Sequence, residues 1–124
     1  AKINKEQVDY INFHGTSTIV NDKVETLAVK NLFNSLSPKI PVSSTKSMVG
    51  HPQGASGGLS VTVSLLSLYN NFLTPTINQE NPDPDCDLDY VPNKGREEKL
   101  NIAVCNCISF GSKNSALVLG KFPR

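Results

Sequence analysis

Two histidines and one lysine are the side chains of this sequence best suited to chemistry. His14 and His51 are the only histidines among the 124 residues, and each of them stands beside a glycine. Lys46 comes five residues before His51, in a segment rich in serine and threonine. A neutral imidazole can donate its ring N–H to an oxygen that gains negative charge during a reaction, such as the oxygen of an enolate. The pattern therefore predicts a site in which two imidazoles stabilise one oxyanion.

Each of these three residues also has a structural interpretation. An imidazole beside glycine is often a hydrogen-bonded part of a loop, and a lysine in a polar segment is usually a solvated surface charge. Both interpretations stay open for any one residue taken alone. The presence of all three in one chain favours the catalytic interpretation.

The elements around the histidines are expected to place them at one edge of a sheet. Residues 8–13 hold four apolar or aromatic side chains and predict a buried strand that ends at His14. His51 precedes a glycine-rich segment, 54–58, which we expect to lie close to another backbone. Residues 59–73 then predict a helix that is buried nearly all round. Because strand ends converge at the carboxyl edge of an α/β sheet, both rings can meet there.

The remaining elements complete an α/β pattern. A helix is predicted over 22–36, and a short extended segment over 40–44. Residues 74–99 contain four prolines and most of the acidic residues, so we expect a surface connection with little regular structure. Two strands, 101–108 and 114–120, follow. The order of strands and helices predicts a mixed sheet with helices packed on it.

Composition excludes several classes of protein. A mass of 13.4 kDa allows one small domain or a piece of one, and a net charge of +1 argues against nucleic acid as a partner. The longest apolar stretch is too short to span a membrane, and the N-terminus lacks a signal-peptide pattern, so we expect a cytoplasmic protein. The spacing of Cys86, Cys105 and Cys107 fits neither a metal knuckle nor a disulfide framework. We expect all three thiols to be structural.

Three groups of residues follow one another in an order found in one enzyme family. The first group is HGTST at 14–18, and the second joins Lys46 to GH at 50–51 and GASG at 54–57. The third joins Asn106 to FG at 110–111 and to Asn114. Together they resemble the C-terminal half of the elongating β-ketoacyl-acyl-carrier-protein synthases. The resemblance covers nearly all of the chain and implies a thiolase-like α/β fold, of which residues 1–124 form the C-terminal half only.

The family condenses an acyl group, held on an active-site cysteine, with malonyl-carrier protein and releases carbon dioxide, in fatty acid or polyketide synthesis. The resemblance implies that His14 and His51 stabilise the enolate formed on decarboxylation, and that Lys46 supports them. Thr16 and Thr18 match hydroxyls that bind the phosphopantetheine arm, although hydroxyls in a turn can equally serve as caps.

The resemblance also assigns a gate and an acidic pair. Phe110 matches the phenylalanine that screens the nucleophile and whose N–H joins the oxyanion hole, and Gly111 would let that loop move. Asp22 and Glu25 match a pair of acids that recurs after the first histidine, and capping of the helix N-terminus explains them adequately. No metal or organic cofactor is expected, because the substrates arrive on the phosphopantetheine of acyl carrier protein. The other expected partners are the N-terminal half of the same synthase and a second subunit, in a homodimer or heterodimer.

Several departures from the family pattern bear on activity. No cysteine here matches the nucleophile, which in the family belongs to the N-terminal half, so we expect a fragment that is inactive alone and exposes a packing surface. Ser60 stands where the family usually has a glutamate that helps to hold the lysine. Ser109 and Ser112 replace glycines of the gating loop and would stiffen it. The alternative is a chain-length-factor-like subunit that condenses nothing; thiolases and chalcone-synthase-like enzymes fit the motifs less well.

Overall fold

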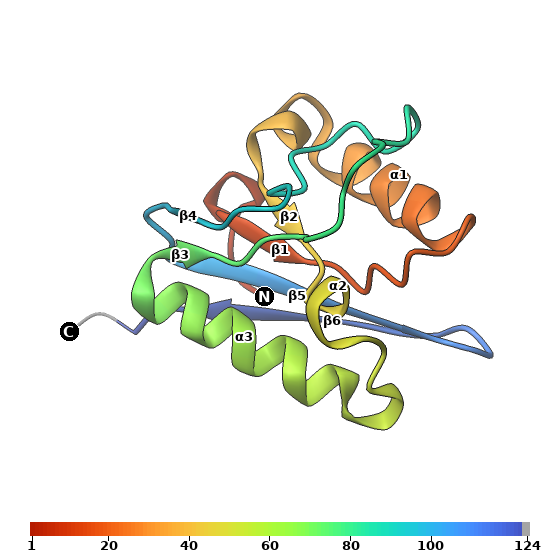
Figure 1. Cartoon of the computed structure of the whole chain (residues 1–124). Coiled ribbons are helices and arrows are strands. Elements are labelled where there is room, and N and C mark those ends of the chain that lie inside the picture. The colour runs from red at the N-terminus through yellow and green to blue at the C-terminus, as the bar shows by residue number, and fades with distance from the viewer. Residues whose placement is uncertain (123–124) are drawn as a thin grey trace.

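Four strands form the main sheet, in the order β2-β1-β5-β6, in the computed structural model of the chain, which describes residues 1–122 (Figure 1). Strand β1 (Tyr10–Asn12) pairs in parallel with β2 (Val42–Ser43) on one side and with β5 (Ile102–Ser109) on the other. Strand β6 (Lys113–Gly120) is antiparallel to β5. The predicted mixed sheet is therefore confirmed. The hairpin β5–β6 lies within a residue or two of its predicted bounds, whereas β1 is shorter than the buried segment 8–13.

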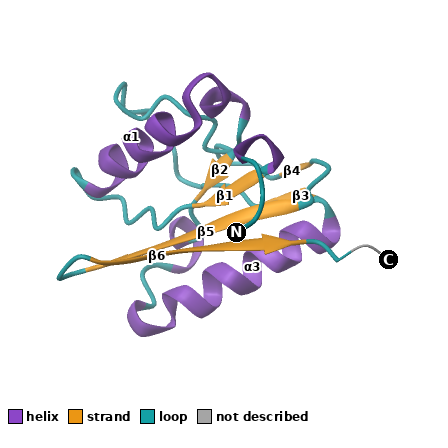
Figure 2. Ribbon diagram, turned by 180° about the vertical axis from the view of Figure 1, so that it is seen from behind, coloured by secondary structure: helices purple, strands orange, loops and turns teal. Residues whose placement is uncertain are grey.

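The two long helices cover opposite faces of this sheet (Figures 1 and 2). Helix α1 (Asn21–Phe33) lies on one face and helix α3 (Ser56–Asn70) on the other. Successive side chains of β1 point to opposite faces, so Ile11 packs in the cluster that contains residues of α1, and Tyr10 packs in the cluster that contains Leu68 of α3. One buried three-residue strand thus links both halves of the core.

Short elements connect these layers. Helix α2 (Lys46–Val49) and the 3₁₀ turn η3 (Gln53–Ala55) lie between β2 and α3. Strands β3 (Phe72–Leu73) and β4 (Arg96–Glu97) form a separate antiparallel pair. A 3₁₀ turn, η1 (Lys5–Gln7), precedes β1. The sequence predicted no helix where α2 lies, because four residues are too few to show a helical period.

Helix α1 ends earlier than predicted. The expected helix 22–36 stops at Phe33, because Asn34 takes a positive φ of 50° that continues no α-helix. The chain then tightens into the 3₁₀ segment η2 (Asn34–Lys39), which contains Pro38. Proline has no N–H to donate, so this segment cannot extend the ladder of α-helical hydrogen bonds.

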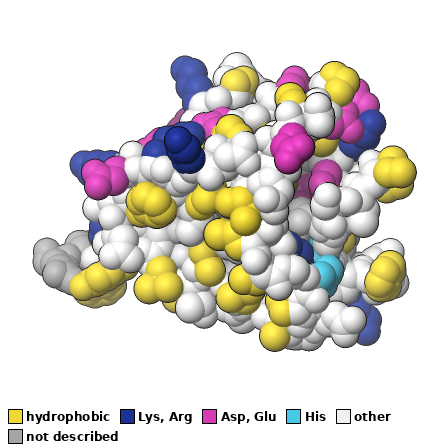
Figure 3. Space-filling view, viewed as in Figure 1, with side chains coloured by type: hydrophobic (Ala, Val, Ile, Leu, Met, Phe, Trp, Pro, Cys, Tyr) yellow, Lys and Arg dark blue, Asp and Glu magenta, His cyan; other side chains and the backbone are white. Residues whose placement is uncertain are grey.

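Helix α3 buries only one of its faces, and that face is polar. The prediction that it is buried nearly all round is wrong, because its buried face consists mainly of the serines at positions 56, 60, 64 and 67. Leu65, Leu66 and Tyr69 are 47%, 55% and 64% exposed. Hydrophobic side chains are correspondingly visible over the part of the surface that carries α3 (Figure 3). Small side chains let the helix lie close to the sheet, and the Sγ of Cys105 on β5 donates to the Oγ of Ser64 at 3.0 Å.

The ends of α3 also differ from the prediction. The helix stops at Asn70, and Asn71 takes the left-handed conformation that leads into β3. A side chain at Gly57 would lie 4.0 Å from the Sγ of Cys107, while Gly54 and Gly58 have no described atom near them. The expected close approach of another backbone to this glycine-rich start is therefore not found within residues 1–122.

The connection 74–99 has little regular structure, as predicted. Apart from β4, it forms one isolated bridge, between Thr76 and Pro92. Ion pairs attach its acidic part to α1: Lys23 Nζ lies 2.7 Å from an Asp85 carboxylate oxygen, and Lys30 Nζ lies 2.6 Å from one of Asp87. Part of this segment lines one side of the cavity described below.

The three cysteines are free thiols. Among the described residues, no helix has the length and apolar character needed to cross a membrane.

Candidate active site

The structure brings the two histidines together. His14 directly follows β1 and Phe13, and His51 lies just after α2, which ends where Gly50 takes a φ of 74°. The centroids of the two imidazole rings are 5.4 Å apart, and their planes are nearly perpendicular, at 80°. Residues 37 positions apart in sequence thus share one edge of the sheet, because His14 ends a strand and His51 precedes a helix.

The hydrogen bonds of His51 define its tautomer. Its Nδ1 accepts the backbone N–H of Gln53 at 3.0 Å, and the Oγ of Ser56 lies 3.2 Å from the same atom. A ring nitrogen that accepts an N–H carries no proton, so the proton of the neutral ring is on Nε2. The His51 imidazole is exposed and keeps that N–H available as a donor.

His14 is buried and neutral. Its side chain is 6% exposed, and its Nδ1 has no hydrogen-bond partner within residues 1–122. Burial lowers the pKa of His14 from 6.5 to about 4; the positive charge of Lys46 and the neighbouring His51 act in the same direction, and Asp22 acts weakly against them. At neutral pH the ring is therefore an uncharged donor.

Lys46 lies at the start of α2 and lines the same groove as His51. Its own pKa is lowered, chiefly by burial. Among the described residues it forms no ion pair within 4.0 Å, and Ser60, at the position where the family usually has a glutamate, is buried in the face of α3. Its charge therefore acts on His14 without a carboxylate in direct contact.

Glu25 is the site residue that sequence analysis assigned to the wrong task. It does not cap α1, whose N-cap residue is Val20 and which has no side-chain cap. Its carboxylate is buried and accepts the backbone N–H groups of His14 and Gly15 at 2.8 and 3.0 Å. It also accepts the side-chain amide of Asn106 on β5 at 3.1 Å. Burial raises the pKa of Glu25, and these hydrogen bonds oppose the rise.

A signal for this role exists in the sequence. Val29 and Phe33 follow Glu25 at intervals of four residues, so all three lie on one face of α1. An acid on the apolar face of a helix is expected to have a buried partner. That partner is the turn that holds His14.

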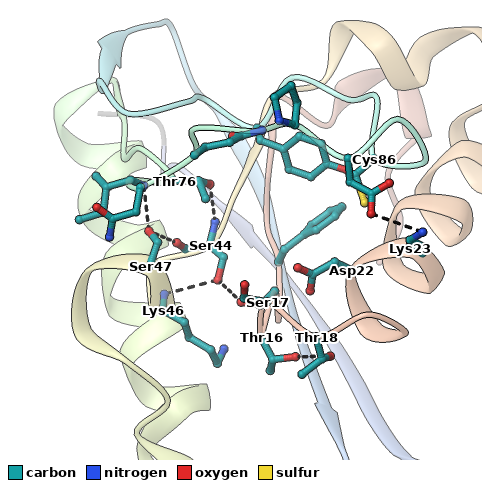
Figure 4. A pocket seen from close by; sticks show the side chains of 18 of the residues that line it. Thr16, Ser17, Thr18, Asp22, Lys23, Ser44, Lys46, Ser47, Thr76 and Cys86 are labelled. Carbon is teal, nitrogen blue, oxygen red and sulfur yellow. Dashed lines mark hydrogen bonds and ion pairs between the residues drawn. The ribbon is translucent and has the colours of Figure 1, made fainter.

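A cavity of about 870 Å³ opens beside His51 (Figure 4), and His14 is not among the residues that line it. His51, Lys46, Thr16 and Thr18 line it, and segment 76–83 forms its opposite wall. The hydroxyls of Thr16 and Thr18 lie 3.0 Å apart and face each other. The groove thus presents hydroxyl groups, a cation and an imidazole along one continuous surface.

Phe110 and Gly111 are not part of this cavity. They lie at the tip of the hairpin β5–β6, where the Phe110 side chain is fully exposed. Gly111 has a φ of 75°, and a side chain there would meet no described atom within 4 Å. The hairpin extends beyond β1 from the same edge of the sheet that carries His14.

No group of three His, Cys, Asp or Glu side chains among residues 1–122 is arranged to hold a metal ion.

The mixed sheet and its helix layers match those of thiolase-like ketosynthase folds. The family described as "Beta-ketoacyl synthase, C-terminal domain" matches residues 1–80, and the chain belongs to this family. It is 50% identical over 121 residues to 3-oxoacyl-[acyl-carrier-protein] synthase 2 of Coxiella burnetii, covering 98% of this chain and 29% of that protein. The synthase of the same name from Synechocystis is 46% identical, with coverage of 94% and 28%.

Solved structures agree with this assignment. The ishigamide ketosynthase/chain length factor matches with a TM-score of 0.93 at 36% identity, over 98% of this chain and 30% of that one. A type II polyketide synthase acyl-carrier protein in complex with its ketosynthase, bound to the hexaketide, matches with a TM-score of 0.95 at 36% identity, over 97% and 29%. The chain therefore spans less than a third of the length of these relatives.

Proposed function

We propose that this chain supplies the decarboxylation site of a β-ketoacyl-carrier-protein synthase, which joins an acyl group to malonyl-carrier protein by a Claisen condensation. The observation that carries this proposal is the pair of imidazoles, with ring centroids 5.4 Å apart, beside a groove lined with hydroxyl groups. Two such donors match the single charged oxygen that forms when a malonyl thioester loses carbon dioxide.

The chemistry assigns a task to each imidazole. Cleavage of the bond between the malonyl carboxylate and its neighbouring carbon releases carbon dioxide, and the electron pair moves to the thioester oxygen. The Nε2–H of His51 and a ring N–H of neutral His14 would donate to that oxygen. The enolate carbon then attacks the acyl thioester held on a cysteine, and the cysteine leaves as a thiolate. In this proposal the cysteine belongs to the N-terminal half of the synthase.

Lys46 supports the pair through charge. Its ammonium lowers the pKa of His14 and so helps to keep the ring in its neutral form. The one N–H of that neutral ring can then donate to the enolate oxygen. The positive charge also favours the bound malonyl carboxylate before decarboxylation. Lys46 needs no contact with the thioester for either effect.

Thr16 and Thr18 are placed to bind the phosphopantetheine arm. Both line the groove, and their hydroxyls can donate to amide oxygens of the arm. Since this arm belongs to acyl carrier protein, the site requires no other cofactor. Phe110 and Gly111 would gate the site from the hairpin, with Ser109 and Ser112 limiting how far that loop moves.

The exposed face of α3 is suited to packing against another part of the synthase. Leu65, Leu66 and Tyr69 lie on a helix whose polar face is already buried, and an apolar face of this kind is suited to packing against another layer. We assign the N-terminal half of the synthase to this face, within a homodimer or heterodimer. Residues 1–124 then form the C-terminal part of one ketosynthase domain and are inactive alone.

A chain-length-factor-like role is the second candidate. Lys46 has no carboxylate in direct contact among the described residues, and one structural neighbour is a ketosynthase/chain length factor. Such a subunit would shape the substrate tunnel of an active partner and would carry no nucleophile itself.

The test uses the chain assembled with the rest of its synthase. His14→Ala and His51→Ala are each expected to slow malonyl-carrier-protein decarboxylation by about 10²–10³-fold while leaving the nucleophile acylatable. Ser37→Ala, which removes a buried hydroxyl bonded to Asn34, is the matched control. Decarboxylation at the parental rate in either histidine variant would rule out the enolate role. Failure of the parental assembly to become acylated would favour the second candidate.

A further inference from the structure

Ser44 joins the two segments that carry the cationic and imidazole groups of the site (Figure 4). It follows β2 and is 7% exposed. Its Oγ donates to the carbonyl of Gly15 at 2.8 Å, and Gly15 is the residue after His14. The same Oγ accepts the backbone N–H of Lys46 at 3.4 Å. One hydroxyl thus contacts the backbone of the His14 turn and of the Lys46 helix.

The backbone of Ser44 is fixed from a third direction. Its N–H donates to the Oγ1 of Thr76 at 3.1 Å. Its carbonyl accepts the Oγ of Ser47 at 2.9 Å, and that Oγ also accepts the N–H of Ile77 at 3.0 Å. Segment 76–77 therefore clamps the start of α2 on both sides of Lys46, and Ser44 cannot move without breaking several hydrogen bonds.

The fit between Ser44 and Gly15 is very close. Gly15 has a φ of 42°, and a Cβ added there would lie 2.5 Å from the Cβ of Ser44. No side chain can occupy that space without a shift of the backbone. The two turns are therefore held in contact on one side by the clamp on Ser44 and on the other by Glu25, which binds the N–H of Gly15.

We propose that Ser44 is a positioning residue whose hydroxyl fixes the Lys46 ammonium relative to the His14 imidazole. The catalytic consequence of this arrangement rests on the proposed function, but the arrangement itself does not. Without the hydroxyl, the Gly15 carbonyl loses its donor and the first N–H of α2 loses its acceptor. The bonds of segment 76–77 to Ser44 and Ser47 remain, but the direct link between the His14 turn and the Lys46 helix is lost, so the two can shift relative to each other.

The pKa of His14 depends on where the Lys46 ammonium lies. The charged and titratable groups that act on it are Lys46 from α2, His51 from the following loop and Asp22 from α1. The Glu25 carboxylate binds its backbone N–H. Since Lys46 is the largest of the charged influences on His14, a change in the position of Lys46 changes the titration of His14 while the other groups stay in place.

The experiment is an NMR titration of the full chain labelled only at histidine, where His14 and His51 give two separate sets of signals. In Ser44→Ala we expect the His14 midpoint to rise by about half a pH unit or more, because the opposing charge of Lys46 is no longer held in place. The control, Ser37→Ala, removes another buried hydroxyl that donates to a carbonyl at 2.8 Å, and the His14 midpoint should not change. Ser44→Thr restores the hydroxyl and should bring the midpoint back.

Two outcomes of this titration would overturn the proposal. An unchanged His14 midpoint in a folded Ser44→Ala variant would overturn the proposal, and so would an equal rise in Ser37→Ala, which would mean general loosening of the fold. If Ser44→Ala does not fold, Ser44→Cys carries the same test, since a thiol is a weaker donor of similar shape. The titration uses no substrate, so a failed decarboxylation test would leave it standing.

Discussion

The carboxylate of Glu25 accepts a hydrogen bond from the side-chain amide of Asn106 at 3.1 Å, across 81 residues of sequence. The same carboxylate holds the backbone N–H groups of His14 and Gly15. Helix α1, the turn after β1 and strand β5 therefore meet at one buried anion. The position of His14 depends on this group as much as on the strand that precedes it.

Replacing this anion by an amide tests its structural role. Glu25→Gln turns one acceptor oxygen into a donor that must face N–H groups, so at least one buried donor loses its partner. We expect a loss of about 2–3 kcal/mol in the free energy of unfolding, measured with urea. Glu6→Gln, an exposed position in η1, should change it by less than about 0.5 kcal/mol. Equal stability of the two variants would contradict the role assigned to Glu25.

The titration of His14 makes stability depend on pH. Its pKa is about 4 in the folded chain and 6.5 in the unfolded chain, so between these values the unfolded chain binds more protons. Stability should therefore fall as the pH is lowered from about 6.5 to about 4. His14→Gln lacks this contribution, and the difference between the two chains in urea unfolding at several pH values isolates it from the carboxylates. A difference that does not vary with pH would be inconsistent with a buried neutral ring.

The threonine pair should affect binding more than chemistry. In the assembled synthase, Thr16→Val and Thr18→Val each remove one hydroxyl from the groove while keeping the branched shape. We expect KM for malonyl-carrier protein to rise about 5–20-fold with kcat little changed, because hydrogen bonds to the arm act alike on the substrate and the transition state. Ser37→Ala is the control, since its hydroxyl bonds to the Asn34 carbonyl and does not line the groove. A fall in kcat at constant KM would point to a catalytic task instead.

Because α3 buries its serines and exposes its leucines, substitutions on its two faces should affect stability differently. Ser64→Leu adds a large side chain where Ser64 contacts Cys105, so the chain should lose about 1–3 kcal/mol of stability in thermal or urea unfolding. Leu66→Ser changes an exposed side chain and should alter the stability of the chain by less than about 0.5 kcal/mol. The same Leu66→Ser change should weaken assembly with the rest of the synthase, measured by ultracentrifugation. A stable Ser64→Leu variant would mean that α3 does not need its small-residue face.

Local pattern was enough to predict much of this protein. The buried strand before His14, the final hairpin and the acidic connection were predicted, because alternation, turn residues and proline act over a few neighbouring positions. The order of the motifs was enough to identify the family, which the comparisons confirmed. The two histidines were paired correctly because strand ends converge at one edge of an α/β sheet.

Only the tertiary structure decided which side of α3 is buried, what Glu25 binds and how Ser44 joins two turns. Serines on a helix look solvated in sequence, yet here they are buried because their small size lets the helix approach β5 closely. Glu25 and Ser44 find partners at residues brought near by the sheet, and long-range hydrogen bonds leave no periodic trace in a sequence. Spacing along the chain fixes which residues share a face, whereas the partner across that face is fixed only when the layers pack.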